Sequence, residues 1–305
     1  MKIGIVGHGS IGQRHAANAR ELGHDVKVYD PIIIGKPDFR FEHQLYDWCD
    51  AAVIATPSPF HESGVRAAVE RGKHVMVEKP ISIAVGALPA ILESAANKNL
   101  IVMMGNNLRL HPCVQQAKEW IVAGHIGNPL WASFICATRT AKPPYVSDGV
   151  ILNTGSHEVD LALHLLGPAK AISANVCMNL GEMTDIIADF VLEHDSGARS
   201  RFHLDFITPN EIREFWIAGE ERNIGVDLPK RLLSLGTTSN HMPGDYDKDY
   251  RAEMEAFIDR IDGKITPGAS ARDGLATLRV LLDVRKMAGL DQTYEHREIK
   301  GWGGQ

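Results

Sequence analysis

The sequence predicts an α/β protein in which an N-terminal, doubly wound parallel sheet is followed by an α+β domain with a large, mostly antiparallel open sheet. Three observations predict this fold. A glycine-rich turn follows the first apolar run, strand-like and helix-like segments alternate over the first third of the chain, and longer β-rich runs begin near residue 130. Alternating strands and helices are typical of parallel βαβ units. A length of 305 residues fits two domains, which we expect at residues 1–118 and 119–305.

The first turn carries a GxGxxG pattern formed by Gly7, Gly9 and Gly12. Gly7 permits a tight turn, Gly9 lets the backbone approach a pyrophosphate, and Gly12 lets the next helix pack closely on the strand. That helix is expected to present Ser10 and Ile11 to the phosphates, because free N–H groups and a positive dipole end favour anions there. The pattern predicts a dinucleotide-binding Rossmann domain; a structural βαβ unit without a ligand is the alternative.

An acidic residue indicates which dinucleotide is bound. Asp30 lies 18 residues after Gly12, at the end of a second apolar run. A carboxylate at this place can accept hydrogen bonds from both ribose hydroxyls of NAD, and it repels the 2′-phosphate of NADP. We therefore expect NAD as the cofactor, rather than NADP.

Polar residues follow the other predicted strands of the first sheet. We expect strands at residues 51–55, 74–77 and 100–104, with helices at 62–71 and 84–98 between them. In doubly wound sheets, ligands bind beyond the carboxyl ends of the strands. The residues at these ends are therefore expected to contact the cofactor, together with the glycines and Asp30: Thr56, Pro57, Glu78, Lys79 and Asn106.

The β-rich part of the chain begins after a helix that we expect at residues 112–122. Turn-like breaks such as residues 195–197 and 219–221 separate its strands, which favours antiparallel pairing. Strands are expected at 130–138, 171–178, 186–194, 198–206, 214–218 and 223–226, and helices at 157–166, 249–261 and 270–288.

Composition excludes several classes of protein. Apolar residues make up 44% and charged residues 23% of the chain, as in ordinary globular proteins. A net charge of −6 provides no basic footprint for nucleic acid or for an anionic membrane. No apolar run approaches the ~18 residues that span a bilayer, and the N-terminus leads directly into a strand instead of a signal peptide. We expect a cytoplasmic protein.

The cysteines and histidines show no metal-binding pattern. Cys49, Cys113, Cys136 and Cys177 lie far apart without a CxxC pair, and the 14 histidines form no ligand spacing such as HExxH. We expect four reduced thiols in or near the core and no metal ion.

Lys79 is a candidate for proton handling, because it stands at a strand end where the nicotinamide is expected. The positive charge of that ring would lower the pKa of the lysine. The amine could then hydrogen-bond a substrate hydroxyl and share its proton. A surface lysine in a turn is the alternative.

His157 is the second candidate, in the first turn of the helix expected at 157–166. An ordinary histidine pKa of about 6.5 suits proton transfer at neutral pH. Asn153 or Ser156 can cap that helix, and Asp160 lies one turn further on, where its carboxylate can orient the imidazole. A capping or packing histidine is the alternative.

Six motifs, in this order along the chain, resemble those of the Gfo/Idh/MocA family, which is named after glucose–fructose oxidoreductase, inositol dehydrogenase and rhizopine catabolism. They are GxGSIGxRH at the N-terminus, Thr56-Pro57 followed by His61, Glu78-Lys79-Pro80, NLRLHP at 107–112, SHEVD at 156–160 and Tyr250-x-x-Glu253-x-x-x-Phe257. The resemblance covers essentially the whole chain, and the Glu78-Lys79-Pro80 motif and the motif around His157, in this order, are far more specific than the glycines.

The resemblance implies a Rossmann domain with a tightly bound nicotinamide cofactor, and oxidation or reduction of a sugar, cyclitol or related alcohol. It makes Lys79 and His157 the catalytic pair, adds His61 to the cofactor site and implies a cis Lys79–Pro80 bond. It also implies homodimers or homotetramers that form through the open face of the C-terminal sheet. Apolar side chains are expected on that face: Ile187, Phe190, Phe202, Leu204 and Trp216.

One residue departs from the family pattern. Asn153 stands where many members carry Asp, and an amide cannot stabilise the imidazolium of His157 by charge. His157 should therefore be a weaker base here, while Asn153 can hydrogen-bond a substrate hydroxyl.

Substrate contacts are expected from Asn107, Arg109, Arg139, Asn153, His157 and Tyr250, with Lys142, Tyr145, His241 and Tyr246 as further loop candidates. Arg109 and Arg139 can bind a phosphate or carboxylate with two parallel hydrogen bonds. That would favour a nucleotide sugar or a sugar acid; solvated loop charges are the alternative.

The leading hypothesis is an NAD-dependent dehydrogenase that transfers a hydride between nicotinamide and a hydroxyl carbon of a sugar, sugar acid, nucleotide sugar or cyclitol. His157, assisted by Lys79, would take the hydroxyl proton. Two alternatives remain: a glycoside hydrolase that uses NAD in a redox-assisted elimination, as in a branch of the same family, and a non-enzymatic sensor of NAD and a sugar.

Overall fold

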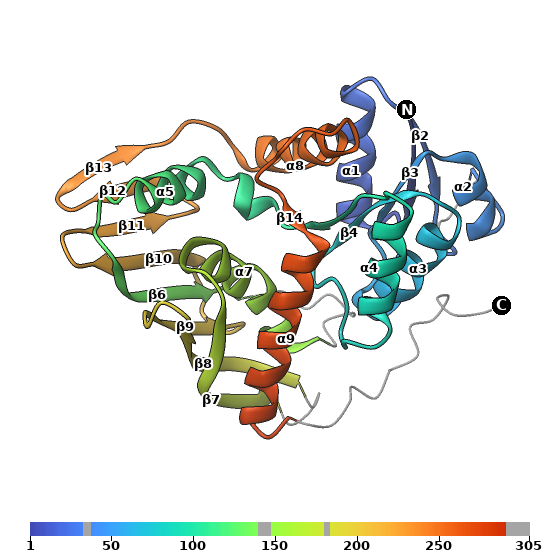
Figure 1. Ribbon diagram of the computed structural model, residues 1–305. Coiled ribbons are helices and arrows are strands. Elements are labelled where there is room, and N and C mark those ends of the chain that lie inside the picture. The colour runs from blue at the N-terminus through green and yellow to red at the C-terminus, as the bar shows by residue number, and fades with distance from the viewer. Residues whose placement is uncertain (33–37, 140–147, 180–183, 291–305) are drawn as a thin grey trace. The chain divides into compact units, whose positions relative to one another are not determined.

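The computed structural model describes residues 1–32, 38–139, 148–179 and 184–290 (Figure 1). They form two compact units that do not follow a single cut in the chain. The first unit combines Met1–Asn107 with Asp245–Leu275, and the second combines Leu108–Gly244 with the segment that begins at Ala276. The domains expected from the sequence are 1–118 and 119–305, which puts the returning segment Asp245–Leu275 in the second domain. The contacts of this segment put it in the first unit instead.

The first unit contains the predicted parallel sheet. Its order is β14-β5-β4-β3-β1-β2, and β14 is antiparallel to β5 while the other strands run parallel. The strands are β1 (Lys2–Val6), β2 (Asp25–Tyr29), β3 (Ala51–Ile54), β4 (His74–Glu78), β5 (Val102–Gly105) and β14 (Ala269–Ser270). All four residues of β3 are buried, as expected of a central strand covered on both faces.

The helices of the first unit are α1 (Ser10–Glu21), α2 (Glu42–Trp48), α3 (His61–Glu70), α4 (Leu88–Asn97) and α8 (Tyr246–Ile261), with the start of α9 (Ala271–Met287). Helices α1, α2 and α3 pack directly on strands of the sheet. Helix α8 lies beside α1 (Figure 1). Met254 and Phe257 of α8 join Ala16 and Ala19 of α1 in the buried core. This burial explains why the returning segment belongs to the N-terminal unit.

The second unit is built on an eight-stranded sheet of order β13-β12-β11-β10-β6-β9-β8-β7. Neighbouring strands are antiparallel except β6 and β9, which run parallel. The strands are β6 (Pro129–Ala137), β7 (Ala169–Asn179), β8 (Thr184–His194), β9 (Arg199–Asp205), β10 (Ile212–Gly219), β11 (Asn223–Asp227), β12 (Leu232–Leu235) and β13 (Thr238–His241), and the helices are α5 (Pro112–Val122), α6 (Gly149–Asn153) and α7 (Gly155–Leu166).

One face of this sheet is a buried aromatic layer. The rings of Phe134, Phe190, Phe202 and Phe215 stack with centroids 4.5 to 5.3 Å apart, and all four side chains are buried. The predicted apolar open face is therefore wrong for Phe190, Phe202 and Leu204, which lie on this covered face.

The opposite face of the sheet carries the exposed tryptophans. Trp216 is 48% exposed and Trp131 is 42% exposed. Trp216 lies between two buried residues of β10, whereas Trp131 follows the exposed Leu130 and precedes the buried Ala132 in β6. Charged pairs occupy the same face nearby: His203 lies 3.0 Å from Asp189, and Arg201 lies 3.9 Å from it. The open face therefore combines indole rings with charged side chains.

Several smaller expectations need correction. Cys49, Cys113 and Cys136 are buried as expected, but Cys177 is exposed. The loop expected around residue 241 is in part a hairpin of β12 and β13, with a turn that holds Gly236 at a φ of 59°. His241 ends β13, and Tyr246 and Tyr250 lie in α8.

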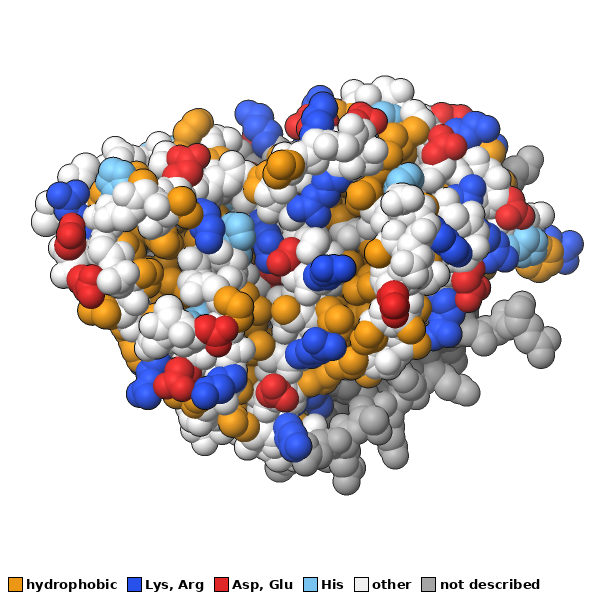
Figure 2. Space-filling model, viewed as in Figure 1, with side chains coloured by type: hydrophobic (Ala, Val, Ile, Leu, Met, Phe, Trp, Pro, Cys, Tyr) orange, Lys and Arg blue, Asp and Glu red, His pale blue; other side chains and the backbone are white. Residues whose placement is uncertain are grey.

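Two observations on the described residues bear on the expected partners. No helix among them is long and apolar enough to cross a membrane. On the face that Figure 2 draws, acidic and basic side chains are interspersed, in line with the net charge of −6.

Candidate active site

The strand ends of the first unit meet at one edge of its sheet, at the place where the strand order reverses. Strand β1 pairs with β2 on one side and with β3 on the other, so the connections after β1 and after β3 leave in opposite directions. In doubly wound sheets this switch point is where ligands bind. The glycine turn, Asp30, Thr56, Glu78 and Asn106 follow β1 to β5 in turn.

The three glycines of the first turn differ in the space around them. Gly7 has a φ of +94°, and a Cβ there would lie 2.5 Å from the carbonyl oxygen of Ala55. A Cβ on Gly12 would overlap the carbonyl oxygen of Gly7. A Cβ on Gly9 would meet no described atom within 4 Å. The turn is therefore tight at Gly7 and Gly12 and open at Gly9.

The open space lies at the N-terminus of α1. Gly9 is the N-cap residue, no side chain caps the helix, and its first turn contains no acidic residue. The N–H groups of Ser10 and Ile11 thus begin a helix whose positive end is left available for an anion. This geometry fits the pyrophosphate of a dinucleotide.

Asp30 is held by the backbone around it. Its Oδ2 accepts the N–H of His8 at 2.6 Å, and its Oδ1 accepts the N–H of Ile32 at 2.8 Å. Each carboxylate oxygen keeps a lone pair for a further donor. The half-buried side chain is therefore oriented in advance for ribose hydroxyls.

The turn after β3 is tied to the turn after β4 by one histidine. Nε2 of His61 lies 2.8 Å from the carbonyl oxygen of Thr56, and Nδ1 lies 2.7 Å from that of Pro80. Both ring nitrogens of this buried residue are thus engaged by backbone, so we assign His61 a positioning role in place of the expected cofactor contact. The Oγ1 of Thr56 is buried without a hydrogen-bond partner among the described residues, which leaves it free to meet a ligand.

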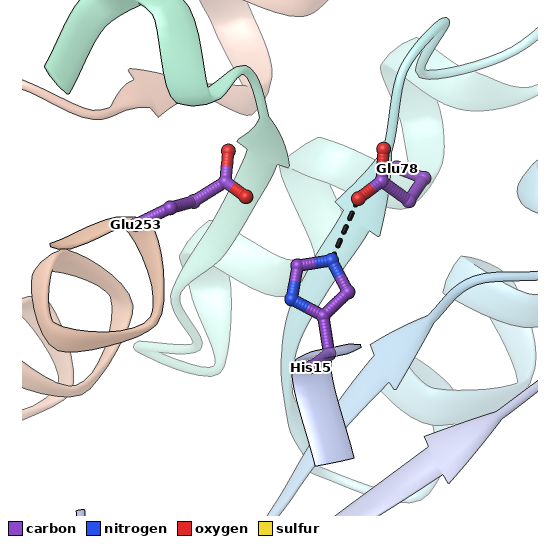
Figure 3. Close-up of side chains that lie close together, drawn as sticks. All are labelled: His15, Glu78 and Glu253. Carbon is purple, nitrogen blue, oxygen red and sulfur yellow. Dashed lines mark hydrogen bonds and ion pairs between the residues drawn. The ribbon is translucent and has the colours of Figure 1, made fainter. Parts of the chain in front are cut away.

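Glu78 is the last residue of β4, Lys79 and Pro80 follow it directly, and the Lys79–Pro80 bond is cis as expected. Oε1 of Glu78 lies 2.6 Å from Nε2 of His15 (Figure 3), while Oε2 accepts the backbone N–H of Lys79 at 3.3 Å. Burial acts to raise the pKa of Glu78, but the hydrogen bond from His15, together with nearby positive charge, brings that pKa below its usual range. Glu78 is thus an anion that binds the backbone of Lys79.

Two asparagines follow β5. Asn106 is 1% exposed and comes directly after the strand, and Asn107 is 3% exposed and begins a short 3-10 helix, Asn107–Leu110. Their place beside the turn of Lys79 follows from the pairing of β4 with β5.

In the second unit, His157 lies in the first turn of α7. Its side chain is mostly buried, and its backbone N–H donates to Thr154. The predicted caps are wrong: α6 runs almost directly into α7, Thr154 has helical backbone angles, and no side chain caps α7. Ser156 instead donates its hydroxyl to the carbonyl oxygen of Asn153 at 2.8 Å.

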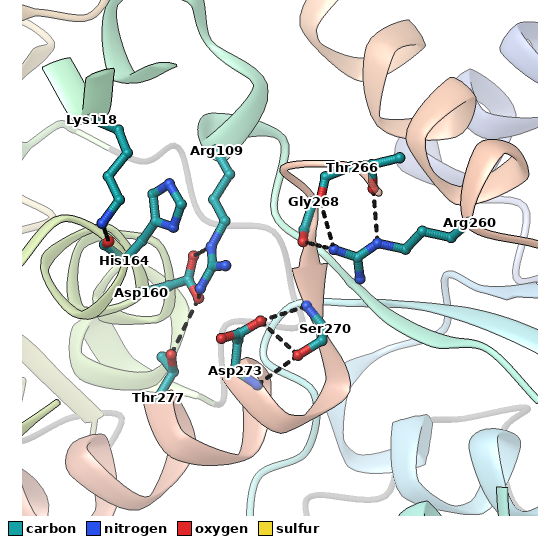
Figure 4. A network of polar contacts seen from close by, with 10 residues as sticks. All are labelled: Arg109, Lys118, Asp160, His164, Arg260, Thr266, Gly268, Ser270, Asp273 and Thr277. Atoms are coloured by element: carbon teal, nitrogen blue, oxygen red, sulfur yellow. Dashed lines mark hydrogen bonds and ion pairs between the residues drawn. The ribbon is translucent and has the colours of Figure 1, made fainter. Parts of the chain in front are cut away.

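The carboxylate of Asp160 holds Arg109 (Figure 4). The Nε and Nη2 atoms of Arg109 each lie 2.7 Å from an oxygen of Asp160, and the hydroxyl of Thr277 lies 3.4 Å from Oδ1. Both charged side chains are buried. Arg109, which the sequence predicts as a substrate contact, is thus held in an internal ion pair with Asp160.

Two further ion pairs anchor the helices around His157, and sequence reasoning did not find them. Arg213 of β10 lies 2.7 Å from Glu158. Arg285 of α9 lies 3.1 Å from Asp185, which also accepts the N–H of Ile151 at 2.8 Å. Burial raises the pKa of Asp185, against the opposing effects of these contacts.

The remaining predicted substrate residues have varied surroundings. Arg139 is exposed after β6, whereas Lys142 and Tyr145 lie outside the described residues. Tyr250 is buried in the first unit, its hydroxyl 3.0 Å from that of Tyr246 and its ring 6.1 Å from that of His15. It is thus part of the packing between α1 and α8.

Both parts of this chain are similar in sequence to known proteins. Residues 1–106 match the family model described as "Oxidoreductase family, NAD-binding Rossmann fold", and residues 114–224 match "GFO/IDH/MocA C-terminal domain". A 1,5-anhydro-D-fructose reductase of Ensifer adhaerens is 26% identical over 93% of this chain and 88% of its own length. A D-xylose 1-dehydrogenase (NADP(+)) 2 of Haloferax volcanii is 24% identical over 92% and 95%. The solved structure of a UDP-N-acetylglucosamine 3-dehydrogenase from Acidithiobacillus ferrooxidans has the same fold, with a TM-score of 0.83 at 21% identity, covering 96% of this chain and 99% of that one.

Proposed function

Because the chain belongs to the Gfo/Idh/MocA family of oxidoreductases, we propose that it transfers a hydride between a nicotinamide dinucleotide and a hydroxyl-bearing carbon of a carbohydrate-like substrate. The observation that carries this proposal is the open space at Gly9 before α1, on the sheet edge where Asp30 and Lys79 also lie. The names of the relatives, a reductase of an anhydro-sugar and a pentose dehydrogenase, support the substrate class.

We propose NAD as the cofactor. The carboxylate of Asp30, fixed by two backbone N–H groups, supports hydrogen bonds to both ribose hydroxyls and opposes a 2′-phosphate. One relative is named for NADP(+), so the choice depends on this chain's own residue at the end of β2. Titration of the protein with NAD and with NADP tests the choice directly.

We propose that Lys79 and His157 handle the hydroxyl proton. A bound nicotinamide would supply the hydride acceptor. In the direction of oxidation the C–H electron pair leaves as hydride, the O–H proton passes to the imidazole of His157, and a carbonyl group forms. The amine of Lys79 would hydrogen-bond the same oxygen and stabilise its developing charge.

Asn153 bears on how readily His157 can accept this proton. It ends α6 and its carbonyl oxygen accepts from Ser156, so the backbone here supports the helix that carries His157. Its amide side chain brings no negative charge that would favour the imidazolium. We propose that the amide hydrogen-bonds a substrate hydroxyl instead.

The test is net formation of NADH from NAD by the purified protein on a panel of sugars, sugar acids, nucleotide sugars and cyclitols. A dehydrogenase reduces NAD stoichiometrically with one class of the panel. Cleavage of an aryl glycoside without net NADH would support the hydrolase instead, and binding of NAD and sugar without turnover would support the sensor. The names of the relatives favour the dehydrogenase over both.

We also propose that copies of the chain associate through the open face of the eight-stranded sheet. The exposed indole rings of Trp131 and Trp216 favour burial against a second copy, and the adjacent pair of His203 and Asp189 could provide polar contacts at its rim. Light scattering should give a mass of two or four chains, and Trp216→Glu should lower it. A monomeric wild type would contradict this proposal.

A further inference from the structure

A buried cluster of three ionisable side chains lies behind the turn of Lys79. His15 comes from α1, Glu78 from the end of β4 and Glu253 from α8, all within the first unit (Figure 3). One ligand-type atom of each residue lies within 4.8 Å of those of the other two. His15 is 0% and Glu253 is 1% exposed. The proposed function gives this cluster no direct task.

One half of the cluster is fully hydrogen-bonded. Nε2 of His15 and Oε1 of Glu78 are 2.6 Å apart, and Oε2 of Glu78 accepts the N–H of Lys79. Gly105 leaves room for this arrangement, because a Cβ there would lie only 3.3 Å from Oε1 of Glu78. The imidazole of His15 is thus connected, through one carboxylate, to the backbone of Lys79.

The other half lacks partners among the described residues. Nδ1 of His15 and both carboxylate oxygens of Glu253 are buried without a hydrogen bond. Figure 3 shows the carboxylates of Glu253 and Glu78 to the left and to the right above the imidazole ring, and one oxygen of each lies within 4.8 Å of the other. A buried, charged carboxylate without a partner is strongly unfavourable, so Glu253 requires either a proton or a cation.

The distances favour a proton. Two carboxylates and an imidazole are also a donor set for a divalent cation, but ligand atoms around a tetrahedral zinc ion lie roughly 3.3 Å apart. The 2.6 Å between His15 and Glu78 is the separation of a hydrogen bond, in which Nε2 keeps its proton. Nδ1 of a neutral imidazole is then an acceptor and needs a donor.

We propose that Glu253 is a neutral carboxylic acid that donates its proton to Nδ1 of His15, through a small side-chain shift or one bridging water. Glu253, His15 and Glu78 then form a relay of hydrogen bonds that holds the backbone of Lys79. Its residues are positioning residues for the reaction, a consequence that rests on the proposed function of Lys79. Nδ1 of His15 and one carboxyl oxygen of Glu253, both buried without a partner, would gain one in this arrangement.

Electrostatics around the cluster agree with this assignment. Burial and the negative charge of Glu78 raise the pKa of Glu253 well above its usual range. The groups that face the cluster from neighbouring elements are Lys79 and His61 beside Glu78, and Tyr250 beside His15. The electrostatic effects of Lys79 and His61 lower the pKa of Glu78, which leaves Glu253 as the proton carrier.

The direct test is the state of His15 in the purified protein without substrate. Nitrogen-15 NMR of labelled histidines, with the signal of His15 assigned from His15→Asn, should show a neutral ring protonated at Nε2 between pH 6 and 8. A doubly protonated His15 at pH 7, or one metal ion per chain in elemental analysis, would overturn the proposal. This measurement requires no turnover, so it tests the protonation of His15 independently of the proposed dehydrogenase activity.

Variants of Glu253 test the consequence for catalysis. Glu253→Gln keeps an N–H donor of the same shape and should keep kcat within about threefold of wild type, whereas Glu253→Leu removes the donor and should lower kcat at least about tenfold. Glu255→Gln, at an exposed position of the same helix, is the control. Equal kcat values for the Gln and Leu variants at equal NAD affinity would contradict the relay. If Lys79→Ala also keeps full turnover, the proposed function fails, while the NMR result still decides the relay.

Discussion

Oδ2 of Asp30 accepts the backbone N–H of His8 at 2.6 Å, so the end of β2 is hydrogen-bonded to the glycine turn that follows β1. The turn and the strand end are also joined by the N–H of Gly7, which donates to Tyr29 at 2.8 Å. These two hydrogen bonds fix a carboxylate beside the uncapped N-terminus of α1. One ligand that carries both a phosphate and a ribose diol would satisfy both groups at once.

Replacing Asp30 should therefore change the cofactor preference. We expect Asp30→Ala to weaken NAD binding roughly 10- to 100-fold, since charged hydrogen bonds are lost, and to leave NADP binding unchanged or stronger. Isothermal titration with both dinucleotides measures this. Asp25→Ala is the matched control, because Asp25 is exposed at the opposite end of the same strand. Unchanged NAD affinity in Asp30→Ala would refute the assignment.

Substitutions of Gly9 and Gly12 should separate NAD binding from the stability of the fold. Gly9→Ala should change the free energy of unfolding by only about 1 kcal/mol, because its Cβ meets no described atom, but it should abolish the stabilisation by NAD. Gly12→Ala should cost about 1 to 3 kcal/mol through overpacking, since its Cβ would overlap the carbonyl oxygen of Gly7. Thermal unfolding with and without NAD checks both. Normal stabilisation of Gly9→Ala by NAD would contradict the site.

The buried pair of Arg109 and Asp160 should matter for stability. Arg109→Met leaves a buried carboxylate without its main partner and should lower the free energy of unfolding by about 3 to 5 kcal/mol. The double variant with Asp160→Leu should recover much of that loss. Urea unfolding measures both proteins. An Arg109→Met variant that is as stable as wild type but has a raised KM would contradict this structural role, and would support the substrate contact that the sequence predicts.

The acid form of Glu253 predicts a particular pH dependence. A carboxyl whose pKa is raised on folding stabilises the protein fully below its unfolded pKa of about 4.3, and this contribution is lost as pH rises toward the folded pKa. Over that window the stability of wild type should fall relative to Glu253→Gln by about 1.4 kcal/mol per pH unit. Urea unfolding at several pH values above 4 checks this. Parallel curves for wild type, Glu253→Gln and Glu255→Gln would mean that Glu253 is ionised.

Lys79 and His157 should be needed for turnover and dispensable for the cofactor. We expect Lys79→Ala and His157→Ala each to lower kcat about 100-fold or more with nearly unchanged NAD affinity. Steady-state kinetics and NAD titration measure the two quantities. His125→Ala, at an exposed histidine after α5, is the control for general histidine loss. Wild-type turnover in the double variant Lys79→Ala/His157→Ala would refute the pair.

Local patterns were enough to predict the part of the site in the first unit. The tight turn at Gly7 and the strand ends at Asp30 and Thr56 depend on residues close together in the chain, whereas the cis bond after Lys79 was implied by the family resemblance. Buried strands such as β3 are apolar throughout, so their limits and parallel order can be read from the sequence.

The parts that sequence reasoning missed depend on contacts between distant residues. Arg109 meets Asp160 across 51 residues, and Arg285 meets Asp185 across 100; no local pattern indicates either partner. Alternation in β9 and β10 indicates two faces, but not which face is covered, so Phe202 and Trp216 were placed on the same side. Helix α8 is amphipathic in sequence, and only its packing against α1 assigns it to the first unit.

The most direct test of the dehydrogenase is the path of the hydride. With the most active alcohol of the substrate panel, deuterated at the hydroxyl-bearing carbon, mass spectrometry of the reduced nicotinamide should find one deuterium for each NADH formed. NADH without deuterium, or no net NADH from any member of the panel, would contradict direct hydride transfer from a carbohydrate-like alcohol.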